Sequence, residues 1–309
     1  MFDTKPAAPA LPPLPPPPPA LPAGARLAWP HRAHAASRGR LYSAFSVALA
    51  AVGCAPPGPA SPVSSTDALR AEVTVAAPLS ATVSYLQSGD PQGPRVILVH
   101  GTPGAATAWA DYLLAPPAGV HLLALDRPGF GRSGPDGPVT GLAEQAAAVL
   151  ALMPTDGRPV VLLGHSLGAP IVARVAADHP QRVSGLVLLA ASMDPSQEFI
   201  HPMQQVGAWF WIKALLPRTL RHANAELMAL KPELEALAQV LPQITARVVI
   251  VHGTRDDLVP VANVPYMQAR LTGARCVTTV LLEGQNHFLP WNSEATVRQA
   301  IRTALEPAC

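Results

Sequence analysis

The chain contains 309 residues, of which 49% are hydrophobic and 14% are charged. This composition excludes a wholly disordered chain and supplies enough apolar side chains for a buried core. The formal net charge of +2 divides into +4 over residues 1–53 and −2 over the rest, so the slightly acidic body is not expected to bind nucleic acid. Three cysteines, with no C-x-x-C or Cys/His cluster, exclude a disulfide-rich scaffold and predict no metal site.

Residues 1–37 are rich in proline and are predicted to lie outside the fold. The run Leu11–Ala20 contains only proline, leucine and alanine, a composition that permits polyproline II or disorder. We interpret the segment as a disordered tail, or as translation from a start codon assigned too early. A ligand for a proline-recognition module is the alternative.

Residues 38–53 have the pattern of a secretory signal peptide, in which basic residues precede a short apolar stretch and small residues follow. The apolar stretch, residues 41–53, is shorter than the ~20 residues that a membrane-spanning helix needs. Ala51-Val52-Gly53-Cys54 resembles the lipobox of bacterial lipoproteins, although Ala51 replaces the usual leucine. The resemblance implies acylation of Cys54, a Pro/Ser tether over residues 54–70 and a lipid anchor in the bacterial cell envelope. An ordinary signal peptide, giving a soluble secreted or periplasmic protein, is the alternative.

From residue 71 to residue 309 the sequence alternates between strand and helix patterns, which predicts an α/β domain. We expect a mostly parallel sheet with helices on both faces, because short β-branched runs alternate with longer helical stretches. The predicted strands are Ala71–Ala76, Ala81–Gln87, Arg95–His100, Val120–Asp126, Pro159–Leu163, Gly185–Ala190, Arg247–His252 and Cys276–Leu282. The predicted helices are Gly141–Met153, Leu167–Asp178, Val261–Leu271 and Ser293–Leu305.

The segment of about 192–245 is too long for a plain connection and is predicted to form a small helical cap. Asp194-Pro195-Ser196-Gln197 has the pattern of a helix start. Phe199, Met203, Val206 and Phe210 then recur at helical spacing, and Pro217, Pro232 and Pro242 are expected to divide the segment into short helices. The apolar side chains, with Trp209 and Trp211, either pack in the core or roof a substrate pocket.

Gly164-His165-Ser166-Leu167-Gly168 lies between a predicted strand and a predicted helix, which is the context of a nucleophile elbow. The sharp turn would lift the Ser166 hydroxyl above the sheet, beside a helix N-terminus that favours negative charge. A hydroxyl needs a base to take its proton, and the base needs an acid that orients it.

Four further patterns show that the chain resembles the α/β-hydrolases over about residues 71–305. The residues His100–Gly104 match the H-G-x-P-G loop of that family, and Asp126–Ser133 match its D-x-x-G-x-G-x-S turn. Gly253–Pro260 match G-x-x-D-x-x-V-P, and Gly284–Phe288 match G-x-x-H-F. The resemblance implies a catalytic triad of Ser166, Asp256 and His287. Asp257 and Asp194 are the rivals of Asp256.

In this interpretation the backbone N–H groups of Thr102 and Leu167 form the oxyanion hole. His100, His165 and His252 are expected to pack or hydrogen-bond rather than transfer protons. Cys276 is expected to be a small buried residue of a strand. Cys309 receives no role.

The sequence therefore predicts a serine hydrolase that cleaves a carboxylic ester through an acyl-enzyme and needs no cofactor or metal. The expected substrate is a small apolar ester, and the expected partner is the membrane that holds the lipid anchor. Related activities are the alternatives, namely C–C bond hydrolase, aminopeptidase or perhydrolase, together with a catalytically silent binding module. The sequence leaves the oligomeric state open.

Overall fold

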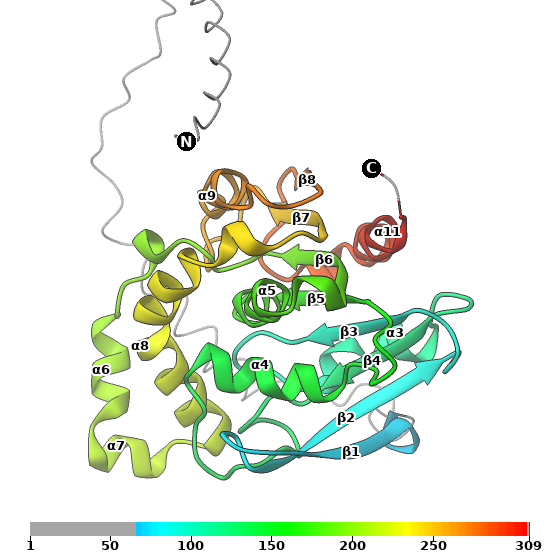
Figure 1. Cartoon of the computed structure of the whole chain (residues 1–309). Coiled ribbons are helices and arrows are strands. Elements are labelled where there is room, and N and C mark those ends of the chain that lie inside the picture. Colours follow the sequence, from blue (N-terminus) through cyan, green and yellow to red (C-terminus); the bar gives the residue numbers. More distant parts are fainter. Residues whose placement is uncertain (1–65, 308) are drawn as a thin grey trace, which may run out of the picture. The chain divides into compact units, whose positions relative to one another are not determined.

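The computed structural model describes residues 66–307 and 309. The predicted tail, the signal peptide and Cys54 lie outside the described residues, as does the tether up to residue 65. Figure 1 shows the arrangement of the elements.

A sheet of eight strands in the order β1-β2-β4-β3-β5-β6-β7-β8 forms the centre of the domain. The strands are β1 (Arg70–Val75), β2 (Ala81–Gly89), β3 (Arg95–Val99), β4 (His121–Leu125), β5 (Val160–His165), β6 (Val183–Leu189), β7 (Arg247–Gly253) and β8 (Cys276–Leu282). β1 and β2 are antiparallel to their neighbours, whereas β4, β3 and β5 to β8 pair in parallel. The expected mostly parallel sheet is confirmed, with each strand within a few residues of its predicted position.

The sheet is buried on both faces because its central strands carry apolar residues on both sides. In β3, for example, Ile97 and Val99 belong to one hydrophobic cluster, and Val96 and Leu98 belong to the other. The first cluster is completed by α4 (Leu142–Ala151), α5 (Gly168–Asp178) and α9 (Asn263–Arg270). The second is completed by α3 (Ala110–Leu114) and α11 (Glu294–Leu305). Helices therefore cover both faces, as predicted (Figure 1).

Short elements complete the connections between the strands. The single turns are η1 (Asp67–Leu69), η2 (Ala106–Trp109), η3 (Pro180–Arg182), η4 (Pro195–Gln197) and η5 (Leu241–Gln243), and the one-turn helix α10 (Leu289–Asn292) precedes α11. Asp194 caps η4 by accepting a hydrogen bond from the Ser196 N–H at 2.9 Å. The helix start predicted at Asp194 is therefore a single turn.

Three helices connect β6 to β7: α6 (Pro202–Ala208), α7 (Phe210–Leu215) and α8 (Arg218–Ala238). The expectation that Pro232 ends a helix is wrong, because α8 continues through it. The proline removes one backbone hydrogen bond. Leu230, Leu234 and Leu237 on either side of it are buried in the first hydrophobic cluster, and this packing holds the helix together.

The exposed apolar residues around α6 and α7 contradict the core-packing interpretation of the cap segment. Phe199 precedes α6, and Trp209 separates α6 from α7, so the four residues do not share one helix. Phe199, Trp209, Phe210 and Trp211 are all exposed. Side chains in these positions do not pack in the core.

Cys276 and Cys309 form a disulfide that the sequence analysis did not predict. Cys276 is half-buried on the edge strand β8 rather than enclosed in the core. The bond joins this strand to the chain after α11, across a separation of 33 residues. The pairing was missed because α11 lies between the two cysteines in sequence, and only its packing against β6 and β7 returns the chain to the sheet edge.

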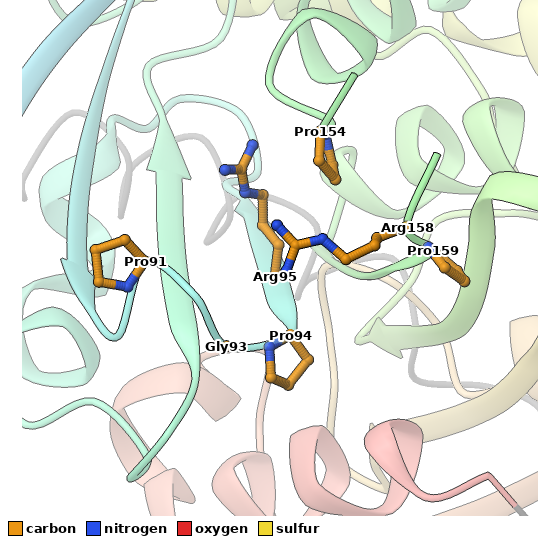
Figure 2. Close-up of a pocket in the computed structure, with 7 residues that line it drawn as sticks. All are labelled: Pro91, Gly93, Pro94, Arg95, Pro154, Arg158 and Pro159. Atoms are coloured by element: carbon orange, nitrogen blue, oxygen red, sulfur yellow. The ribbon is translucent and has the colours of Figure 1, made fainter. Parts of the chain in front are cut away.

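A pocket of about 260 Å³ lies at the amino ends of β3 and β5, and is therefore at the opposite edge of the sheet from Ser166. Its lining consists of Pro91, Gly93, Pro94, Arg95, Pro154, Arg158 and Pro159 (Figure 2). Arg95 donates to the Leu152 carbonyl at 2.6 Å, and Arg158 pairs with Asp156 at the same distance. Both arginines thus brace the loops of this edge.

Within residues 66–307, no helix combines the length and the apolar character that crossing a bilayer would require.

We expect the disulfide to contribute to stability. Closing a loop of 33 residues restricts the unfolded chain, and the chain-entropy estimate for this length is roughly 3–4 kcal/mol. Cys309→Ser should lower the free energy of unfolding by about this amount, as measured by urea denaturation. Dithiothreitol should lower the stability of the parent protein similarly and leave the variant unchanged. Equal stability of parent and variant without reductant would contradict the bond.

Candidate active site

The carboxyl ends of four parallel strands bring the predicted site residues to one edge of the sheet. His100 follows β3, Ser166 follows β5, Asp256 follows β7, and His287 follows β8. β3, β5, β6 and β7 are consecutive neighbours in the sheet, and β8 pairs with β7. Parallel strands end at a common edge, so residues separated by up to 187 positions meet there.

Ser166 occupies a tight turn between β5 and α5, with a φ of +55°. This left-handed conformation is unfavourable for a residue other than glycine, and it occurs often at functional sites. The Ser166 N–H donates to the Leu189 carbonyl at 2.9 Å, and the Ser166 carbonyl accepts from the Ala169 N–H at 3.0 Å. Both neighbouring segments therefore hold the turn in place.

Two glycines make this turn possible. A Cβ on Gly164 would lie 2.4 Å from the Gly168 carbonyl oxygen, so the strand and the helix approach each other too closely for any side chain there. A Cβ on Gly101 would lie 2.8 Å from the Ser166 Cβ. The loop after β3 therefore passes directly beside the serine, as the predicted elbow requires.

His287 and Asp256 form a buried hydrogen-bonded pair, with Nδ1 of the ring 2.7 Å from Oδ2 of the carboxylate. The other oxygen, Oδ1, accepts from the N–H groups of Leu258 at 3.0 Å and Val259 at 2.8 Å. A carboxylate only accepts, so His287 Nδ1 carries the proton and Nε2 presents a free lone pair. This arrangement suits the ring to accept a proton.

Neither of the two rival carboxylates forms a hydrogen bond with the His287 ring in the described part of the chain. Asp257 is exposed, next to the buried Asp256. Asp194 is occupied as the cap of η4, and its backbone N–H donates to the Asn263 side chain at 2.8 Å. Among the three, Asp256 is the carboxylate that contacts His287.

Two further histidines surround this pair as neutral groups. The His165 ring lies 4.8 Å from the His287 ring, and its Nε2 contacts the His287 carbonyl at 3.0 Å. Burial, with the nearby His287 as a second cause, lowers the pKa of His165 to about 3. Burial also lowers the pKa of His252, whose Nε2 donates to the Val259 carbonyl at 3.0 Å. Neither ring adds a positive charge beside Asp256 at neutral pH.

The backbone N–H groups of Thr102 and Leu167 flank the Ser166 turn. In the described part of the chain, neither N–H donates to a carbonyl or a side chain. An oxyanion hole consists of such N–H donors, which remain free to bind the oxygen of a substrate.

The direction of the Thr102 N–H is set by the Gly101 carbonyl, because both belong to one planar peptide and point in opposite directions. The Gly101 oxygen accepts from His100 Nδ1 at 2.7 Å and from an Arg127 terminal nitrogen at 3.0 Å. His100 Nε2 in turn accepts from the Arg127 backbone N–H at 3.1 Å, which leaves the ring proton on Nδ1. Burial, followed by the Arg127 charge, holds the pKa of His100 well below its usual value.

Arg127 is completely buried and forms a bidentate ion pair with Glu226 of α8, at 2.6 and 3.0 Å. Gln145 of α4 contacts both partners. The Asp126–Ser133 turn matches a family pattern in the sequence, whereas Glu226 lies in none of the matched patterns. No local pattern marks Glu226, because its partner is 99 residues away in sequence.

Aromatic side chains form an exposed rim beside the histidine. Phe288 lies 5.9 Å from the His287 ring, and Trp291 lies 5.9 Å from the His165 ring. Both are exposed over a large part of their surface. The neighbourhood of the site is therefore apolar.

Comparison with known proteins agrees with the fold. The family described as alpha/beta hydrolase fold matches residues 94–211. A pimeloyl-[acyl-carrier protein] methyl ester esterase from Aeromonas hydrophila is 31% identical over 237 residues, which cover 63% of this chain and 89% of the relative. The chain belongs to the α/β-hydrolase family.

Other matches to this α/β-hydrolase are shorter or more distant. The esterase of the same name from Edwardsiella ictaluri is 40% identical over 97 residues, so the match spans only 31% of this chain and 36% of that relative. The enol-lactonase structure from Burkholderia xenovorans has a TM-score of 0.60 at 18% identity, with 76% of this chain and 99% of that chain covered, and supports the fold alone. The esterase relatives bear out the expected enzyme class, a hydrolase that acts on ester bonds.

We expect Glu226 to stabilise the fold, because it neutralises Arg127, which in turn holds the Gly101 carbonyl. Glu226→Ala leaves the buried Arg127 charge uncompensated, a change that typically costs about 3–5 kcal/mol of unfolding free energy. The matched control is Asp156→Ala, which breaks the exposed pair with Arg158 and should cost much less, because water already screens that pair. Urea denaturation compares the two variants, and equal losses would contradict the role of burial.

Proposed function

We propose that this α/β-hydrolase is a serine hydrolase that cleaves a carboxylic ester through an acyl-enzyme, with Ser166, His287 and Asp256 as its triad. The observation that carries the proposal is the 2.7 Å hydrogen bond between His287 Nδ1 and Asp256 Oδ2. This bond fixes the one tautomer in which Nε2 can act as a base toward a serine hydroxyl.

The reaction begins when Ser166 Oγ attacks the acyl carbon and His287 Nε2 takes the hydroxyl proton. The carbonyl π electrons move onto oxygen and give a tetrahedral oxyanion. As the oxyanion collapses, the ester C–O bond breaks and His287 returns the proton to the departing alcohol. Water then attacks the acyl-enzyme by the same steps, releasing the acid and restoring Ser166.

The oxyanion is held by the N–H groups of Thr102 and Leu167. The negative charge develops beside the start of α5, whose helix dipole also favours it. Asp256 stabilises the imidazolium that forms on His287. Asp256 Oδ1 accepts hydrogen bonds from two backbone N–H groups, and these bonds keep the carboxylate in place.

The proposed substrate is a small ester with an apolar acyl or alcohol group. Phe288 and Trp291 support this class, because they place exposed aromatic surface next to the two histidine rings of the site. The relatives named pimeloyl-[acyl-carrier protein] methyl ester esterases support an ester as the substrate.

We also propose that the protein is exported and lipid-anchored at Cys54 in a bacterial cell envelope. The signal-peptide pattern at 38–53 supports export. The Cys276–Cys309 disulfide adds independent support, because structural disulfides persist in oxidising compartments outside the cytoplasm.

Ser166→Ala tests the nucleophile and Asp256→Asn tests the acid. Ser166→Ala should abolish labelling by a fluorophosphonate and hydrolysis of p-nitrophenyl esters, while circular dichroism stays unchanged.

Asp256→Asn should lower kcat on the order of 10⁴-fold, because the histidine then adopts the wrong tautomer. The matched control, Asp257→Asn, changes a neighbouring exposed carboxylate and should retain activity. Loss of activity in Asp194→Asn instead of Asp256→Asn would reassign the acid.

Mass spectrometry of the protein isolated from membranes tests the anchor. We expect a mature N-terminus at Cys54 that carries two or three acyl chains, since a single chain gives only marginal membrane binding. Cys54→Ser should prevent acylation and cleavage at this position. An unmodified N-terminus upstream of Cys54, or a plain cleavage downstream of it, would exclude the lipoprotein and leave the hydrolase proposal intact.

A further inference from the structure

The segment from Phe199 to Leu215 exposes large apolar side chains in a continuous stretch of the chain. The exposed fraction is 64% for Trp209, 73% for Phe210, 77% for Trp211 and 82% for Leu215. Phe199, Ile200, Met203 and Ile212 of the same segment are also exposed. A segment with this many exposed apolar side chains is characteristic of an interaction surface.

Specific contacts hold this segment onto α8. His201 and Gln204 form a capping box at the start of α6. The Asn224 side chain of α8 donates to the Gln204 carbonyl at 2.9 Å. All six residues of α7 are exposed, in contrast to the buried leucines of α8. The structure therefore fixes the base of the segment and leaves its apolar side chains outward.

The charges of this region have one sign. No Asp or Glu occurs from residue 199 to residue 225, whereas Lys213, Arg218 and Arg221 lie within it. Lys213 is exposed in the middle of α7, and both arginines are half-buried at the start of α8. Aromatic rings flanked by cations, without acids, match an anionic lipid surface, where tryptophan occupies the headgroup level and lysine binds the headgroups.

We propose that the face formed by residues 199–215 docks on an anionic lipid bilayer, with the side chains of α7 entering the interface. The occupant is a bilayer rather than a second copy of the chain. A symmetric pair would place the Lys213 side chains of both copies in the same contact, without an acid in the segment to neutralise them. The docking requires neither the triad nor acylation of Cys54.

Vesicle binding by the full chain tests the proposal. All proteins contain Cys54→Ser and are synthesised in a cell-free system, so that every sample shares the same unacylated residues 1–65. The patch variant is Trp211→Glu with Leu215→Glu. The matched control is Leu114→Glu with Leu281→Glu, because these two leucines are also exposed, at 47% and 52%, but lie on α3 and β8. Flotation with vesicles of phosphatidylcholine, with and without phosphatidylglycerol, measures the partition coefficient.

The patch variant should partition at least tenfold more weakly than the parent, since withdrawing one large apolar side chain from an apolar phase costs on the order of a tenfold change. The control should bind like the parent. Lys213→Glu should weaken binding by roughly fivefold or more, and only to the vesicles that contain phosphatidylglycerol. Each variant should still hydrolyse a dissolved p-nitrophenyl ester, which separates this proposal from the proposed function.

Equal vesicle binding by the parent, the patch variant and the control would overturn the proposal. Sedimentation velocity tests whether a second copy of the chain occupies the face instead. A dimeric parent and a monomeric patch variant that bind vesicles equally would also overturn the proposal. Binding that is equal on neutral and anionic vesicles would overturn the proposal as well, because the proposed occupant is an anionic bilayer.

Discussion

The geometry of this site depends on one peptide group, the one that joins Gly101 to Thr102. Its carbonyl accepts from His100 and Arg127, and its N–H is thereby directed the opposite way, beside the Ser166 turn. The same loop must approach the serine so closely that only glycine fits at position 101. A single planar unit thus couples the buried charge network on one side to the proposed oxyanion site on the other.

Burial gives that network its strength and also makes it sensitive to change. Arg127 and Glu226 are removed from water, so their attraction is poorly screened and every remaining donor needs a partner. Those partners are the Gly101 carbonyl and the Gln145 side chain, in two different parts of the chain. The core of the α/β sheet and helix α8 are therefore joined by an ionic contact as well as by leucine packing. The nearby histidines stay neutral because the same burial lowers their pKa values.

The connection between β6 and β7 combines two kinds of surface. Helix α8 is amphipathic, and its buried leucines and Glu226 attach it to the domain. Helix α6 is joined to α8 by the hydrogen bond from Asn224 to the Gln204 carbonyl, and the segment leaves its large apolar side chains exposed. One insertion thus supplies an inner helix that stabilises the site and an outer segment available for binding. This division explains why the apolar spacing of the segment was misleading. The apolar residues recur as the sequence suggests, but their side chains are exposed and do not face the protein core.

The sequence by itself determined the order and type of the main elements, because β-branched runs and helix formers alternate with a clear period from residue 71 onward. It also predicted the candidate site residues, since Ser166, Asp256 and His287 each follow a predicted strand and lie in patterns that resemble one family. Only the tertiary structure decided which carboxylate meets His287, because Asp256 and Asp257 are adjacent in sequence and only the turn after β7 buries one and exposes the other. It likewise decided that Pro232 lies within a helix, that Cys276 pairs with Cys309, and that Glu226 neutralises Arg127. Each of these outcomes depends on contacts between residues far apart in the chain, and local periodicity has no means of specifying such contacts.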